Sequence, residues 1–332
     1  MAPKVGGQTV KLARRKILHV AAAAVVLSAA TRIASALDYP ARPVHIIVGF
    51  PAASGPDIIT RLVAQQLSER LGQQFIVENR PGAGGSIATQ TVVNAAADGY
   101  TLLTATTANA INATLYPNLN FNFVRDVAPV AFISRTPFVM VVNPAFPARA
   151  IPEFVAYAKV NPHKINMASA GIGTMTQLCY ELLKMMTGLD LVHVPYRATY
   201  LPDLIGGQVQ GAFSTVPQAI AFIKDGRLRA LAVTSTARVD ALPDIPSLGE
   251  FVPGYEADGW FGIVAPKTTR GEIIGKLNSE INAAVADPKL RAEFRELGVS
   301  PMSMAPAEFG QLIADQTEKW GKVIKVADIK PE

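Results

Sequence analysis

A strand-loop-helix pattern that occurs three times constrains the fold of this chain most. In the first copy, the apolar run Val44–Val48 reads as a buried strand, small residues fill a loop over 49–55, and a helix opens at Pro56. Proline near the first helical position already has the required dihedral angle, and Gly72 favours the left-handed cap that ends a helix. Such a helix N-terminus offers unpaired N–H groups and partial positive charge, so it favours an anion over the loop.

The other two copies indicate that several such loops meet. One copy has a strand over 74–78, a loop over 79–86 and a helix ending near Ala96; the other has a strand over 165–168 and a loop over 169–174. In open α/β sheets, ligands bind in the crevice outside the carboxyl ends of the strands. We therefore expect one polar cleft that favours anions.

The length and the order of the elements predict two lobes. A chain of 332 residues exceeds the size at which a single core stops growing, and strands that alternate with helices predict mostly parallel sheets. Two long apolar runs, 127–143 and 255–265, are expected to cross between the lobes. We predict an α/β fold in which lobe 1 contains 37–137 with 260–332 and lobe 2 contains 138–259.

The first 36 residues have the pattern of a secretory signal peptide. A basic start precedes an apolar run over 17–30, and Ala34-Ser35-Ala36 forms a cleavage site. We expect export to the periplasm with cleavage after Ala36; an uncleaved anchor is the alternative. The Arg14-Arg15 pair leaves the general and the twin-arginine routes both open.

Composition argues against several classes of function. Removing the six basic residues of the leader from the 31 Lys and Arg leaves 25 against 26 Asp and Glu, so the mature chain has no electrostatic reason to bind nucleic acid. No phosphate-binding loop motif occurs, and the histidines lack ligand spacing. We expect no cofactor and no metal.

An ordered set of short motifs resembles the extracytoplasmic solute receptors of tripartite tricarboxylate transporters, also called the Bug family. The motifs are Val48-Gly49-Phe50-Pro51-Ala52 with Asp57, Val77-Glu78-Asn79-Arg80-Pro81-Gly82-Ala83-Gly84-Gly85, Asp98-Gly99-Tyr100-Thr101-Leu102-Leu103, Ser169-Ala170-Gly171 with Gly173-Thr174, His193-Val194-Pro195-Tyr196 and Trp260-Phe261-Gly262. They span essentially the whole mature chain in order.

The resemblance implies a periplasmic binding protein of the two-lobed, type II-like fold. It would be a monomer that holds a small organic carboxylate between its lobes and delivers it to the membrane subunits of a transporter. In this family, backbone groups and ordered water from the first loop and the Ser-Ala-Gly loop hold one carboxylate. Two departures stand out: Ala53-Ser54 replaces two glycines, and Ser214 replaces an acid that can pair with a ligand ammonium group. The second departure argues against an amino acid ligand.

The candidate ligand-binding residues lie on these loops and strand ends. Ser169 and Thr174 are expected to add hydroxyl donors, Phe50 and Tyr196 to form flat walls, and Asp57 either to cap its helix or to contact the ligand. A polar stretch over 105–110 is expected to be a further loop at the same edge. The full set is Phe50, Ala52, Ala53, Ser54, Asp57, Gly84, Gly85, Thr106, Asn109, Ser169, Gly171, Gly173, Thr174, Tyr196 and Ser214.

Three questions stay open at this level. Trp260 and Phe261 fit either a cleft wall or the core. The receptor could serve a signalling system instead of a transporter. From another class, Ser169 could be the nucleophile of a secreted hydrolase, although Met167 stands where the nucleophile elbow needs a glycine.

Overall fold

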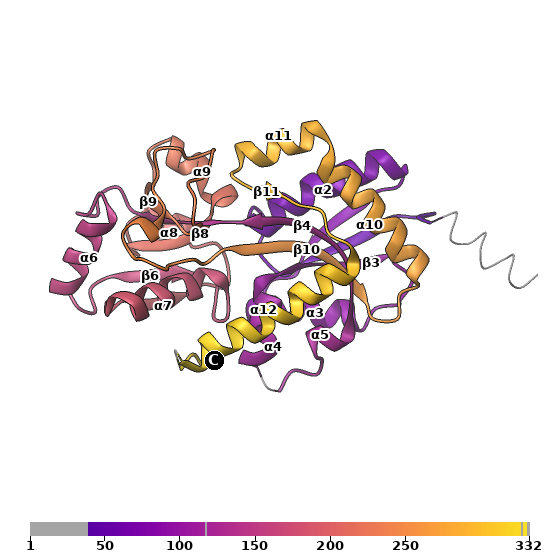
Figure 1. Cartoon of the computed structure of the whole chain (residues 1–332), viewed down its shortest axis with the longest axis horizontal. Helices are drawn as coiled ribbons and strands as arrows, with labels where there is room; N and C mark the ends of the chain where they lie inside the picture. The colour runs from indigo at the N-terminus through magenta and orange to yellow at the C-terminus, as the bar shows by residue number, and fades with distance from the viewer. Residues whose placement is uncertain (1–38, 117, 327, 331–332) are drawn as a thin grey trace, which may run out of the picture. The chain divides into compact units, whose positions relative to one another are not determined.

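The computed structural model describes residues 39–116, 118–326 and 328–330 (Figure 1). The expected signal peptide and its cleavage site lie outside the described residues. From Arg42 onward the chain forms one compact unit. None of its described helices is both long and apolar enough to cross a bilayer.

A six-stranded sheet contains the first three strands of the chain. Its strands, in chain order, are β1 (Val44–Val48), β2 (Phe75–Asn79), β3 (Thr101–Thr106), β4 (Val127–Thr136), β10 (Gly259–Pro266) and β11 (Ser300–Pro301). Their order across the sheet is β11-β4-β10-β3-β1-β2. β1 pairs in parallel with β2 and β3, while β10 pairs antiparallel with β3 and β4.

A five-stranded sheet holds the middle of the chain. It contains β5 (Phe138–Val142), β6 (Asn166–Ser169), β7 (Val192–Pro195), β8 (Gly211–Thr215) and β9 (Arg229–Val233), in the order β7-β6-β8-β5-β9. β6 is parallel to β7 and β8, and β5 is antiparallel to β8 and β9. The α/β class is confirmed, but the sheets are more mixed than predicted because the strands that cross or follow a crossing pair antiparallel.

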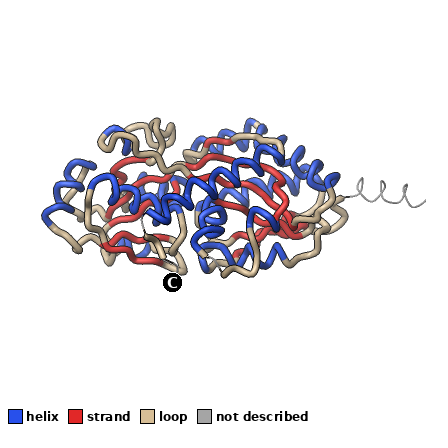
Figure 2. Tube along the Cα trace, turned by 60° about the horizontal axis from the view of Figure 1, so that its bottom comes forward, coloured by secondary structure: helices blue, strands red, loops and turns tan. Residues whose placement is uncertain are grey.

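Helices cover both sheets, as Figure 2 shows. On the six-stranded sheet, α2 (Gly55–Leu71), α10 (Gly271–Ala286) and α11 (Pro288–Glu296) lie on one side, and α3 (Ser86–Val93), α4 (Thr107–Leu115), α5 (Phe123–Asp126) and α12 (Pro306–Val326) on the other (Figure 1). The five-stranded sheet carries α6 (Ile151–Val160) and α7 (Met175–Thr187) on one side and α8 (Leu201–Ile205) and α9 (Val216–Lys224) on the other.

Alternation along β5 explains why both faces of the smaller sheet need cover. Phe138, Met140 and Val142 pack with α6 and α7, whereas Val139 and Val141 pack with α8 and α9. Successive strand residues point to opposite faces, so a strand that is apolar throughout must be covered on both.

The two sheets are joined where the sequence predicted. β4 ends at Thr136 in the larger sheet, and β5 starts at Phe138 in the smaller one, with Pro137 between them. The chain returns through 255–258 into β10. The exact lobe boundaries stay a prediction, since the whole region packs as one unit. Further contact comes from α12, whose Trp320 and Ile324 pack into the core of the smaller sheet.

Gly262 tests the packing of the returning strand. A methyl group there would collide with the ring of Phe309 and lie 2.8 Å from the carbonyl oxygen of Ala131, and Phe309 is held edge-on against Trp260 at 5.5 Å between ring centroids. We expect Gly262→Ala to lower the unfolding free energy by about 1–3 kcal/mol through overpacking, measured by denaturant unfolding. Gly275→Ala, in α10 with open space around it, should instead raise it by about 0.5–1 kcal/mol; equal effects of the two changes would contradict this account.

Candidate functional site

Two adjoining cavities lie where strand ends and loops of the two sheets meet. The outer cavity has a volume of about 700 Å³ and the inner one about 50 Å³. Phe50 and Ala170 line both cavities, and they pack in one small apolar cluster. The predicted cleft is therefore present in two parts, with a phenyl ring between them.

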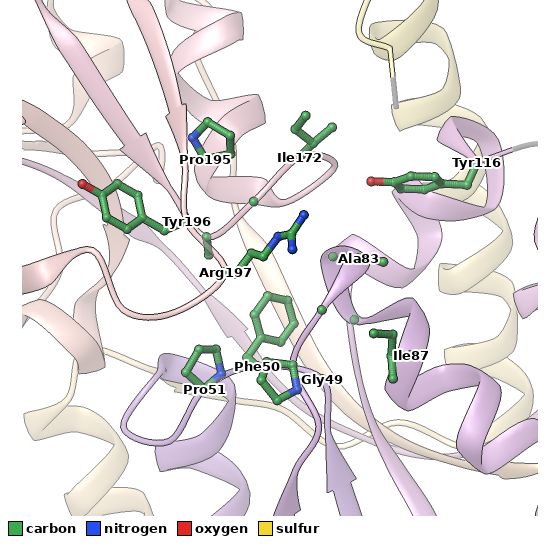
Figure 3. A pocket seen from close by; sticks show the side chains of 16 residues that line it. Gly49, Phe50, Pro51, Ala83, Ile87, Tyr116, Ile172, Pro195, Tyr196 and Arg197 are labelled. Carbon is green, nitrogen blue, oxygen red and sulfur yellow. The ribbon is translucent and has the colours of Figure 1, made fainter. Parts of the chain in front are cut away.

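Three loops and the segment after β7 line the outer cavity (Figure 3). The larger sheet contributes 49–51 and 81–85, and the smaller sheet contributes 170–172 and 195–197. Most of these residues are glycine, proline or apolar. Arg197 is the one charged side chain among the lining residues, and its guanidinium extends into the cavity.

The inner cavity is lined by buried polar groups that have no hydrogen-bond partner in the described part of the chain. They are the hydroxyls of Ser54 and Thr215 and the indole N–H of Trp260. These residues are 7%, 5% and 3% exposed. Ser54 precedes α2, Thr215 ends β8, and Trp260 lies in the returning strand β10, so both sheets and the crossing between them supply a donor.

The first loop is held by Asp57. Its carboxylate accepts hydrogen bonds from the backbone N–H of Ala53 at 2.8 Å, from Asn79 Nδ2 at 2.8 Å and from Arg61 Nε at 3.0 Å. The carboxylate is buried and lines neither cavity. It therefore fixes the loop, which includes Ala53 at a φ of +60° where an alanine is strained.

The loop after β6 is also tied internally. Ser169 Oγ lies 2.7 Å from His193 Nε2, and Thr174 Oγ1 donates to the carbonyl of Gly171 at 2.6 Å. The N–H groups of Ala170, Gly171 and Gly173 donate to side-chain oxygens of the same segment. Fewer main-chain donors face the cleft than the sequence indicated, because side chains of the loop satisfy them.

The polar stretch over 105–110 is not a loop, which corrects that expectation. β3 runs to Thr106, and α4 begins at Thr107. Thr106 and Asn109 form a capping box, in which Thr106 Oγ1 accepts from the N–H of Ala108 and Asn109 Oδ1 accepts from the N–H of Thr106. Asn109 Nδ2 donates to Thr89 at 2.8 Å, so both the oxygen and the nitrogen of this amide form hydrogen bonds inside the protein.

The structure separates the remaining predicted residues. Phe50, Gly84, Gly85, Gly171 and Tyr196 line the outer cavity, and Phe50, Ser54, Thr106 and Thr174 line the inner one. Seven residues line neither cavity: Ala52, Ala53, Asp57, Asn109, Ser169, Gly173 and Ser214. Their role as ligand contacts stays a prediction.

Several lining residues were not anticipated from the sequence. Arg197 and Tyr116 line the outer cavity, and Thr215 and Gln218 line the inner one. The open question over Trp260 and Phe261 has a double answer: both line the inner cavity, and both are buried. For Thr215, the sequence did contain a signal: it follows the predicted site residue Ser214 directly, at the end of β8.

The two halves of the site touch closely. A methyl group on Gly55, the first residue of α2, would collide with the side chain of Thr215. One on Gly173 would lie 2.6 Å from Leu115 of α4, and one on Gly84 would lie 3.1 Å from the carbonyl oxygen of Ile172. Only glycine permits these approaches, so the two halves are in close contact in this structure.

His193 is neutral in this environment. Burial, together with the nearby charge of Lys184, lowers the pKa of His193 to about 4. Its Nε2 is occupied by Ser169, and the tautomer of the ring decides which atom donates. The described residues contain no group of three or more His, Cys, Asp or Glu that could hold a metal ion.

Comparison with known proteins identifies the family. The family described as tripartite tricarboxylate transporter family receptor matches residues 59–329. The chain belongs to this family. Protein BugT of Bordetella pertussis is 34% identical over 301 residues, which cover 89% of this chain and 92% of BugT. The resemblance seen in the sequence is confirmed.

Solved structures of similar proteins agree with the fold. The periplasmic binding protein BugD superposes with a TM-score of 0.85 at 32% identity, over 89% of this chain and all of that one. A protein from R. palustris, Rpa4515 with adipate, superposes with a TM-score of 0.86 at 32% identity over the same shares. The receptor thus has the two-lobed binding-protein fold that the sequence predicted.

His193 generates a pH prediction. Because its folded pKa lies below the ordinary 6.5, the unfolded chain takes up the proton first as the pH falls. The unfolding free energy should therefore decrease between about pH 6.5 and about pH 4 and stop decreasing through this group below that window. Partial exposure limits the loss to about 1–2 kcal/mol. In His193→Gln, this part of the pH dependence should be absent from denaturant unfolding.

The difference between the two proteins isolates His193. Burial raises the pKa of Asp258 to about 6, so protonation of Asp258 increases the unfolding free energy as the pH falls through the same window. This contribution is present in both wild type and His193→Gln and cancels in their difference. Parallel pH profiles for wild type and variant would contradict the assignment.

Proposed function

We propose that the chain is a periplasmic receptor that captures a small organic carboxylate and delivers it to the membrane subunits of a tripartite tricarboxylate-type transporter. The observation that carries the proposal is the inner cavity with its three unpartnered donors, Ser54, Thr215 and Trp260. These three donors suit the binding of a hydrogen-bond acceptor among otherwise largely apolar lining residues.

A carboxylate matches these donors. An unmade hydrogen bond at a buried polar group costs about 1–3 kcal/mol, so three such groups favour an occupant that accepts from all of them. A carboxylate has about four lone-pair sites and donates nothing. The cavity of about 50 Å³ has room for such a head group or for a few waters, since one water needs about 10–15 Å³.

The arrangement also supports closure around the ligand. Ser54 belongs to the larger sheet and Thr215 to the smaller one, so an acceptor between them bridges the halves. A ligand that binds only the closed state shifts the protein toward that state. Closed and open receptors would then present different surfaces to the membrane subunits.

The relatives support the ligand class. The adipate in the R. palustris protein is a carboxylate. Ser214, at the end of β8, supplies no negative charge to pair with a ligand ammonium group, and its hydroxyl donates to Gln218 at 3.3 Å. We therefore expect carboxylates without an amino group to bind better than amino acids.

One observation favours a hydrolase as the second candidate. Ser169 and His193 lie at hydrogen-bond distance, as a nucleophile and its base would. Ser169 is fully buried, however, and lines neither cavity. We propose that the pair fixes the loop after β6 and that the chain has no enzymatic activity.

Binding of carboxylic acids to the mature protein is the direct test. We expect at least one small carboxylate to raise the melting temperature by several degrees at about 100 times its dissociation constant, because such binding adds about 2.7 kcal/mol. Glutarate should bind more tightly than glutamate by calorimetry. If no acid shifts the midpoint while a nitrophenyl ester is hydrolysed and Ser169→Ala abolishes that hydrolysis, the receptor proposal is wrong.

Gly55→Ala tests closure separately from folding. The added methyl would meet Thr215 across the cleft but fits the helix itself. If the ligand-free protein opens at this contact, as the proposal requires, its unfolding free energy should stay within about 0.5 kcal/mol of wild type. Affinity for the acid found above should fall by about tenfold to a hundredfold, the effect of 1–3 kcal/mol of overpacking in the closed state only.

Gly271→Ala is the matched control. Gly271 is likewise the first residue of a helix, α10, and has nothing within 4 Å of an added methyl. It should leave affinity unchanged. Wild-type affinity in Gly55→Ala would show that the ligand-bound state does not need this approach.

A further inference from the structure

We infer that Arg197 determines specificity by binding a second carboxylate at the far end of the ligand. The preferred ligand is then a dicarboxylate with an apolar middle, whose first carboxylate occupies the inner cavity. This inference rests on the proposed function and adds to it the class of acid and the residue that selects it.

The placement of Arg197 is the first observation. It follows β7 by two residues, is exposed, and extends from the smaller sheet into the outer cavity. In Figure 3 its guanidinium lies between Ile172 and Ala83, above the ring of Phe50 in this view. A ligand whose first carboxylate lies in the inner cavity would have to extend past Phe50, which lines both cavities, to reach Arg197 in the outer one.

The base of this side chain is fixed. The N–H of Tyr196 donates to the carbonyl of Ser169 at 3.0 Å, which continues the pairing of β6 and β7. The hydroxyl of Tyr196 donates to Asp203 at 2.7 Å, and its ring packs near that of Tyr200 at 6.2 Å between centroids. Tyr196 therefore turns its hydroxyl away from the cleft and anchors the backbone from which Arg197 extends.

Arg197 has no ion pair or hydrogen bond with any residue that the structure describes. Two other arginines near the site are engaged, Arg61 with Asp57 and Arg80 with Glu78. Asp203, the acid nearest in sequence, accepts from Tyr196. Arg197 thus keeps its five donors available for an occupant of the cavity.

The rest of the outer cavity carries no charge. Phe50, Ile87 and Ile172 offer apolar side chains, three prolines line it, and the remaining residues are glycine, alanine and tyrosine. The inner cavity of about 50 Å³ cannot enclose more than a head group, whereas the outer one of about 700 Å³ can enclose a hydrocarbon chain. An apolar chain between two acidic ends fits neutral donors at one end, apolar walls in the middle and a guanidinium at the other.

Guanidinium and carboxylate geometry makes the choice of anion specific. The planar fork of arginine matches the two oxygens of a carboxylate, and such charge-assisted pairs are stronger than neutral hydrogen bonds. A monocarboxylate of equal length would place a methyl group beside Arg197. The methyl end of that ligand makes no hydrogen bond with the guanidinium of Arg197 and displaces water that solvates it.

The test compares ligand pairs and arginine variants by calorimetry. The ligands are succinate, adipate and suberate, each paired with the monocarboxylate of equal length: butyrate, hexanoate and octanoate. Wild type should prefer the dicarboxylate for at least one length. Arg197→Gln should weaken that dicarboxylate by about tenfold to a hundredfold and change its monocarboxylate partner by less than about threefold.

Two further variants separate local from general charge effects. Arg197→Lys keeps the charge but not the planar fork of the guanidinium. Its affinity for the dicarboxylate should therefore lie between the affinities of wild type and Arg197→Gln. Arg80→Gln removes the same charge from a residue that flanks the cavity-lining loop but pairs with Glu78. It should leave the preference for dicarboxylates unchanged.

The outcomes distinguish the two levels of the argument. If no acid binds wild type, the proposed function fails. If acids bind but wild type does not prefer a dicarboxylate, or Arg197→Gln weakens both members of a pair equally, or Arg80→Gln matches it, the receptor function stands and the role of Arg197 is wrong.

Discussion

The close approach of Gly55 to Thr215 is the contact on which the site depends. The first turn of α2 belongs to the larger sheet and the end of β8 to the smaller one, yet no side chain larger than hydrogen fits between them. This approach brings Ser54 and Thr215 to one cavity and completes it with Trp260 from the returning strand. A site assembled from two halves exists only when they are together, so a ligand that binds both halves would stabilise their contact.

Internal hydrogen bonds explain why the loops can bind without rearranging. Asp57 holds the first loop by Ala53 and Asn79, and Gln177 holds the loop after β6 by the N–H of Gly173. These side chains use up main-chain donors that could have met a ligand. In exchange the loops are held in place before a ligand binds. The binding free energy is then not reduced by the entropic cost of ordering them. The unpartnered buried side-chain donors that line the inner cavity are two hydroxyls and one indole N–H.

Local patterns were readable from the sequence, and long-range ones were not. β1, α2 and the cap at Gly72 were predicted because apolar period, proline and glycine act over a few residues. The stretch over 105–110 was misread as a loop because a capping box has the same polar residues as a ligand loop; only the helix that follows distinguishes them. Arg197 was not predicted as part of the site, since its reach into the cleft depends on how β7 pairs with β6. The antiparallel pairing of β10 likewise follows from the direction in which the chain returns, which no local pattern encodes.

The division of labour between neutral and charged donors has a physical reason. Among the buried side chains that supply donors to the inner cavity, a cation without a fixed partner would carry a large desolvation cost, whereas a hydroxyl or an indole N–H costs far less. Arg197 in the outer cavity is exposed, so water can solvate it until a ligand arrives and the charge can be kept at little cost. The neutral end then accepts a carboxylate whose charge is met by dipoles, and the exposed end adds an attraction that depends on a second negative charge. Because exposed pairs are screened by salt and enclosed hydrogen bonds are not, the two ends should differ in their response to ionic strength: affinity for monocarboxylates should be nearly insensitive to salt, and the extra affinity for dicarboxylates should fade as salt rises.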